Sequence, residues 1–283
     1  MAASIGLREL ETREHELRKS RMVMVDGNLT ANLDTVQRGL SARAYLGGYW
    51  GFASAPLGSG GSSSAGARER VQSQALDNAR AMARFGARKP MPLPPASHQG
   101  RHSFAGRAAL SPAQCNDRLA QLHAYCKQQY PDLRSSRFMI GQEHHTKQLR
   151  TDRGGDCLAS IQRAQFMLVL SGVDASGAPI EVDDVVSCKG NLADLDWSLD
   201  TLAPLLDRVH EHLQAKRHAV AARGGQATVV LAPELAGMLA HEAMGHPCEA
   251  DAVLGGAVTA SLAGQPVASE LVTMVDIAHT WRG

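Results

Sequence analysis

The segment MVMVDGNLTANL (Met22–Leu33) is the strongest indication of fold class in this chain, because it carries the pattern of a β-hairpin. Apolar residues precede Asp26-Gly27, a residue pair that favours a two-residue hairpin turn. A second hairpin signal follows, with Gly39–Leu46, the turn Gly47-Gly48 and Tyr49–Ala53. The aromatic residues of the last segment suit a strand packed on one face. The first part of the chain therefore predicts antiparallel strands.

Helices and further strands follow in mixed order. The predicted strands cover Arg137–Arg150, Cys157–Val173, Pro179–Lys189 and the short buried segment Thr228–Leu231. The predicted helices run from Ser64 to about Phe85, from Ser111-Pro112 to Tyr125, from near Thr201 to Arg223, and onward from Pro233. A Gly/Ser-rich stretch, Gly58–Gly66, is interpreted as a flexible linker. This order indicates an α+β fold with antiparallel sheets and packed helices.

Composition excludes several classes of function. The chain has 283 residues, is 44% hydrophobic, and carries 29 basic against 28 acidic residues. A net charge near zero gives no argument for a nucleic-acid or membrane partner. The five cysteines are scattered without a CxxC motif, which favours a reduced, cytoplasmic setting. The N-terminus lacks the apolar core of a secretory signal, and the run Phe166–Leu170 is too short to cross a bilayer.

The segment HEAMGH (His241–His246) carries the candidate chemistry. Neutral imidazoles bind zinc well, and a neighbouring glutamate can take a proton from water. The usual spacing is HExxH, whereas one extra residue intervenes here. On a regular helix this rotates His246 roughly 140° away from His241. A one-residue π-bulge would absorb the offset, and Gly245 is where the helix could distort with least resistance.

Other residues near the motif have simpler interpretations. From spacing alone, His241 and His246 could be ordinary helix histidines. Cys248 is interpreted as an unliganded thiol, and Glu249 and Asp251 as capping, orienting or cleft residues. A second cluster, Glu143-His144-His145, is interpreted as a polar strand end, because adjacent residues of a strand point to opposite faces.

Several landmarks together resemble one family of metallopeptidases, the TldD/PmbA or "modulator of DNA gyrase" family. The resemblance covers most of the chain, and its specific part is HExxxH followed by Glu249 and Asp251. The other matching segments are Gly39–Arg43, Gly48–Ala53, Thr228–Leu231, Gly264–Ser269 and Val275-Asp276. The HExxxH motif is typical of the TldD side of the family, whereas the PmbA (TldE) partner generally lacks it.

The resemblance implies a zinc metallopeptidase that hydrolyses unfolded or flexible peptides. It implies zinc held by His241 and His246, with Glu242 as the base that activates water. It also implies a cytoplasmic heterodimer with a PmbA/TldE-like subunit. The third zinc ligand in the family is a cysteine from a C-terminal part that this chain lacks, so no residue here is assigned to that ligand.

Two departures from the family pattern leave an alternative open. Pro247-Cys248 stands where the family usually has Gly-Leu, and a proline there would end the helix. The chain stops at Gly283, whereas family members continue. The alternative is therefore a truncated, non-catalytic remnant or interaction subunit of a TldD/PmbA-type complex, without stoichiometric zinc. A DNA- or gyrase-binding role rests on the family's name alone.

Three regions are predicted along the chain. Residues 1–110 form an N-terminal hairpin and helix region with a Pro-rich connector, and residues 111–223 add a helix, antiparallel strands and a long helix. Residues 224–283 form the start of a metallopeptidase C-terminal domain that carries the HExxxH helix. The fold expected from this division is an N-terminal α/β domain followed by the start of a β-rich C-terminal domain.

Overall fold

The computed structural model describes residues 7–58, 64–86, 96–104, 106–249, 252–253 and 257–275. The chain divides into two compact units, Met1–Val220 and Ala221–Gly283. The three-region division at residues 110 and 223 stays a prediction. No helix within the described residues is both long enough and apolar enough to cross a membrane.

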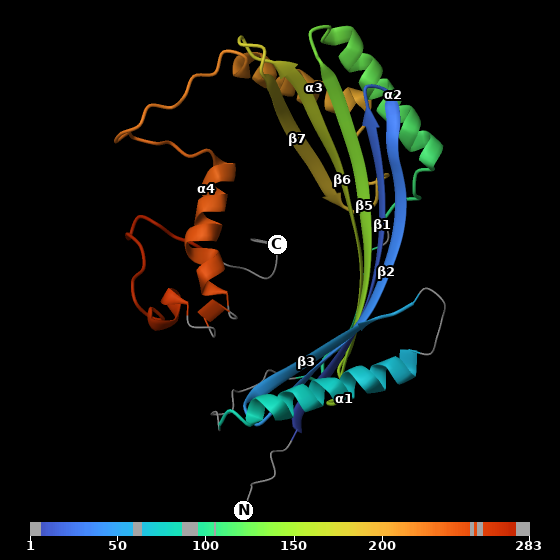
Figure 1. Cartoon of the computed structure of the whole chain (residues 1–283), viewed down its shortest axis with the longest axis vertical. Coiled ribbons are helices and arrows are strands. Elements are labelled where there is room, and N and C mark those ends of the chain that lie inside the picture. The colour runs from blue at the N-terminus through green and yellow to red at the C-terminus, as the bar shows by residue number, and fades with distance from the viewer. Residues whose placement is uncertain are drawn as a thin grey trace, which may run out of the picture. The chain divides into compact units, whose positions relative to one another are not determined.

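One seven-stranded sheet dominates the first unit (Figure 1). The strand order is β3-β2-β1-β5-β6-β4, and β7 pairs with β6 as well. All neighbours are antiparallel except β4 and β6, which are parallel. The strands are β1 (Leu7–Val25), β2 (Asn28–Leu46), β3 (Tyr49–Pro56), β4 (Gln99–Ser103), β5 (Ser135–Thr151), β6 (Asp156–Val173) and β7 (Pro179–Lys189). The predicted α+β class is confirmed.

The first predicted hairpin forms around Asp26-Gly27, which joins β1 to β2. Both residues have positive φ, 50° and 80°, as the tight turn of a twisted hairpin requires. The Asp26 carboxylate also accepts hydrogen bonds from the Ser136 amide at 2.8 Å and the Ser135 hydroxyl at 3.1 Å, which ties the turn to β5. The second hairpin forms between β2 and β3, so the two predicted hairpins share one strand of 19 residues.

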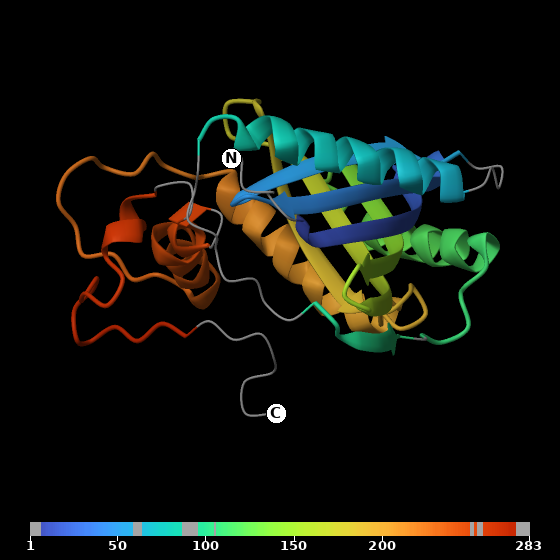
Figure 2. The same ribbon diagram turned by 90° about the horizontal axis from the view of Figure 1, so that it is seen from below.

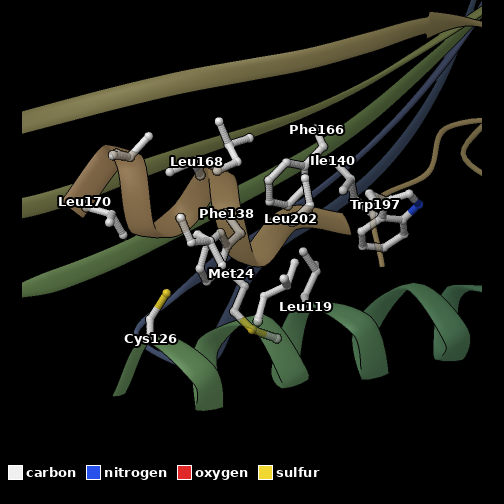
Figure 3. Close-up of a cluster of buried hydrophobic side chains, with 14 of the residues drawn as sticks. Met24, Leu119, Cys126, Phe138, Ile140, Phe166, Leu168, Leu170, Trp197 and Leu202 are labelled. Carbon is white, nitrogen blue, oxygen red and sulfur yellow. The ribbon is translucent and has the colours of Figure 1, made fainter. Parts of the chain in front are cut away.

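Three helices cover one face of this sheet. They are α1 (Ser64–Ala83), α2 (Pro112–Gln129) and α3 (Leu199–Lys216). Helices α2 and α3 bury apolar side chains of β1, β5 and β6 (Figure 3). Among these side chains, Phe166 stacks on Phe138 and on Trp197. Burial of such aromatic side chains is the main favourable contribution to a core. This cluster therefore holds the sheet and the two helices together.

Helix α2 begins where its sequence predicts. The Ser111 hydroxyl accepts a hydrogen bond from the Gln114 amide at 3.2 Å, and the Gln114 side chain accepts one from the Ser111 amide at 2.9 Å. Together with Pro112 at the first helical position, this reciprocal capping box fixes the start of the helix.

Helix α1 packs closely against the β2–β3 hairpin (Figure 2). The apolar side chains of Val71, Ala75 and Ala79 meet Leu40 and other small apolar residues of β2. Gly51 of β3 lies directly under the helix backbone: a Cβ atom there would come within 2.0 Å of the Ala75 carbonyl oxygen. The absence of a side chain at Gly51 therefore permits this close approach of helix and strand.

Two predictions are wrong, and both for lack of packing partners. Helix α3 ends at Lys216 instead of Arg223, because its buried apolar face ends at Leu213 and the next large apolar residue, Val220, is 90% exposed. The predicted buried strand Thr228–Leu231 is irregular, with Val230 92% exposed, since no described strand lies beside it to accept its hydrogen bonds.

The structure adds one strand and leaves part of the connector undescribed. The edge strand β4 lies inside the predicted Pro-rich connector and pairs with β6. Residues 87–95 of that connector, and residues 59–63 of the predicted linker, lie outside the described residues. In the second unit, expected to be the start of a β-rich domain, the described residues form helices and irregular segments without a strand.

Candidate metal centre

The second unit carries the HExxxH motif on a helix that begins as predicted. Helix α4 (Pro233–Ala240) has proline at its first position, where a missing amide hydrogen has no structural cost. A π-helical turn, η1 (His241–Gly245), follows without interruption. The His246 amide donates to the carbonyl oxygen of His241, five residues earlier. The π-bulge predicted from the motif spacing is therefore confirmed.

The wide turn brings His241, Glu242 and His246 together. One potential ligand atom from each of the three side chains lies within 4.8 Å of the others. The two imidazole rings lie nearly parallel, with centroids 5.5 Å apart and planes inclined by 23°. The Glu242 carboxylate lies 3.5 Å from Nδ1 of His246. On a regular helix the five-residue spacing would place the rings on different sides.

This donor set fits a divalent metal such as zinc. Imidazoles are common ligands of catalytic zinc sites, which keep one position open for water, and a carboxylate beside the metal can take a proton from that water. All three side chains are exposed, so a metal and a substrate could reach them. Within the described part of the chain, no further His, Cys, Asp or Glu joins this group. The role of each residue stays a prediction.

The chain turns away directly after the second histidine. Residues His246–Cys248 form a 3₁₀ turn, η2, and Glu249 leaves the helical conformation with ψ 141°. Pro247 thus ends the helix, as its sequence predicts. The Cys248 thiol is exposed. Cys248 and Glu249 both lie outside the three-residue group, and Asp251 lies outside the described residues.

Replacing Gly245 with Ala is expected to leave metal binding unchanged within about twofold. Gly245 has ordinary helical angles, φ −60° and ψ −56°, and an added Cβ would meet its nearest neighbour, Met274 Cε, at 3.5 Å. Alanine also favours a helix over glycine by about 1 kcal/mol. Zinc titration by calorimetry would check this. A variant that loses zinc would show that the π-turn does need the freedom of glycine.

The second histidine cluster lies in the middle of β5, where a strand end was predicted. His144 and His145 point to opposite faces, as expected: His144 Nε2 lies 2.8 Å from the Ser160 hydroxyl, and His145 Nδ1 lies 3.0 Å from Nε2 of His15. Glu143 binds the other nitrogen of His145 at 3.0 Å. Burial, followed by the nearby charge of Lys147 and by His145, lowers the pKa of His15. The contact with His15 depends on strand register, which local sequence does not reveal.

The segment that carries this site is similar to a known family of domains. Residues 224–283 match the model of the PmbA/TldA metallopeptidase C-terminal domain. No protein of curated function matches the chain. This match lies within the second unit, and the solved structures described next are similar to the chain in fold.

Two solved structures of low sequence identity share this fold, and a third is less similar. A candidate modulator of a DNA gyrase from Thermotoga maritima is 14% identical with a TM-score of 0.57, over 77% of this chain and 46% of that one. A corresponding protein from Bacteroides thetaiotaomicron is 14% identical with a TM-score of 0.53, over 74% and 46%. TldE from Thermococcus kodakarensis is 15% identical with a TM-score of 0.47, over 73% and 44%. The chain thus spans about half the length of these proteins.

Proposed function

We propose that this chain is a TldD-like zinc metallopeptidase that hydrolyses unfolded or flexible peptides. The observation that carries the proposal is the π-turn, which gathers His241, Glu242 and His246 within 4.8 Å. The description of the matching family model, a metallopeptidase domain, supports the same chemistry. The family resemblance further supports a cytoplasmic heterodimer with a PmbA/TldE-like subunit.

The three side chains divide the work of hydrolysis. His241 and His246 would hold the metal through neutral imidazole nitrogens. A bound zinc ion would supply a Lewis acid and lower the pKa of water. Glu242, beside His246 at 3.5 Å, accepts the proton of the water that attacks the peptide carbonyl and returns it to the leaving amine. The exposure of all three side chains leaves room for an extended peptide.

Metal removal and restoration tests this proposal. The full chain, alone and with a PmbA/TldE-type partner, is expected to hold one zinc ion by elemental analysis and to cleave a fluorogenic unstructured peptide. Chelation should abolish cleavage, and added Zn²⁺ should restore it, because the ion generates the nucleophile at neutral pH. If both preparations lack zinc and activity, the chain is instead a non-catalytic interaction subunit of such a complex.

A further inference from the structure

A hollow lies on the sheet face opposite to α1, entirely within the first unit. One row of directly paired residues crosses five strands there: Gly39, His15, Lys147, Ala159 and His102. Residues paired in this way point to the same face of a sheet. The alternate residues of β2, Leu40 and Ala42, point to the other face and pack under α1. The row is therefore on the open side, towards the end of the sheet where β3 and α1 lie (Figure 1).

Small residues between long ones leave a cavity along this row. Gly39 and Ala159 have little or no side chain, whereas Lys147 and the neighbouring Arg13 have long side chains that line the cavity. The cavity has a volume of about 930 Å³. Sites for organic ligands measure roughly 300–1,000 Å³, so this cavity could hold one such molecule.

The cavity combines an excess of positive charge with apolar walls. On the open face its lining holds the cations Arg13 and Lys147, whereas the one lining carboxylate, Glu14, alternates with His15 and points to the other face. Glu14 already faces two guanidinium groups outside the lining, at 3.5 and 3.7 Å. Apolar contact on this face is available from Leu149, which is paired with Arg13, and from Pro56, which is paired with Gly39.

Lys147 is the cation most available to a ligand. Arg13 shares the Glu11 carboxylate at 3.5 Å, and Arg101 pairs with Asp156 at 3.1 Å. Lys147 is exposed and forms no ion pair with any described residue. A cation that is not neutralised, beside an apolar wall, favours a ligand with one charged and one apolar part.

We infer that this cavity binds a small organic anion with an apolar body. Lys147 pairs with the charged group, and Leu149 and Pro56 contact the body. It shares no residue with the proposed metal centre, because every lining residue belongs to the first unit.

Binding of anilinonaphthalene sulfonate to the full chain, followed by fluorescence, tests the inference. Lys147→Met is expected to weaken this binding about tenfold, because it removes a hydrogen bond to a charged group and keeps the length of the side chain. Phenylnaphthylamine is the same ring system without the sulfonate, and its binding should not change. Lys127→Met, on the exposed end of α2, is the matched control and should leave both probes unaffected.

A second variant separates the cavity from general surface binding. Ala159→Phe fills the floor of the cavity and should also weaken binding of anilinonaphthalene sulfonate about tenfold, with Lys147 intact. Sodium decanoate should displace the probe, whereas sodium sulfate at equal ionic strength should not, because sulfate has no apolar body. Equal affinity of the parent and both variants, or an equal loss for the neutral probe in Lys147→Met, would overturn the inference.

Discussion

Replacing Glu242 with Gln is expected to reduce peptide hydrolysis about 10³-fold while zinc remains bound. The amide keeps the size of the side chain but cannot accept the proton of the attacking water, and proton transfer of this kind contributes about 10²–10⁴-fold. Retained zinc follows from the two imidazoles, which the substitution leaves in place. Steady-state hydrolysis of a fluorogenic peptide, with zinc content measured on the same sample, gives both quantities.

Glu234 provides the matched control. It is an exposed glutamate in the first turn of the same helix, α4, and it lies outside the group of potential ligands. Glu234→Gln should hydrolyse the peptide at the parental rate. If Glu242→Gln is as active as the parent, Glu242 is not the base. A variant that loses zinc together with activity would instead make Glu242 a ligand.

The second large effect is expected when Gly51 is replaced with Ala. This substitution should lower the free energy of unfolding by about 3 kcal/mol, which is in the upper part of the range for overpacked cores. The added methyl group would lie 2.0 Å from the Ala75 carbonyl oxygen and 2.2 Å from the Ala79 amide nitrogen. Both atoms belong to the α1 backbone, which cannot rotate away as a side chain could. The helix must therefore move off the β2–β3 hairpin.

Urea unfolding followed by circular dichroism measures this change. Gly39→Ala is the control, because Gly39 lies in the adjacent strand β2 and its added Cβ would be 3.9 Å from the nearest atom. That variant should be as stable as the parent or slightly more so, since alanine reduces the freedom of the unfolded chain. Equal stability of Gly51→Ala and the parent would show that the close packing of α1 on β3 does not contribute to stability.

Local signals predicted most of the elements of the first unit. The Asp26-Gly27 pair specifies its turn, and the Ser111-Pro112 pair specifies the start of α2, because each acts through contacts a few residues away. The strand β4 was missed because its five residues pair only with β6, more distant along the chain. The segment Thr228–Leu231 has the composition of a strand, but composition cannot supply a neighbouring strand.

The candidate sites were also predictable only where local sequence determines the structure. The spacing of His241 and His246 predicted the π-turn on the assumption that both histidines hold one metal, because a regular helix would place them on different sides. The contact between His15 and His145 could not be predicted, since it depends on the pairing of β1 with β5. The same holds for the cavity around Lys147, which several strands build together.

That pairing of β1 with β5 also bears on how the first unit reaches its native state. The contacts of β1 with β2, and of β5 with β6, join neighbouring segments across short turns, whereas β1 meets β5 only after α1, β4 and α2 have been synthesised. Closing a long loop costs conformational entropy before the contacts between its two ends can stabilise the chain. We therefore expect the β1–β2 and β5–β6 hairpins to form early, and the pairing of β1 with β5 to limit the refolding rate. Substitutions along the β1–β5 seam would then slow refolding more than they accelerate unfolding.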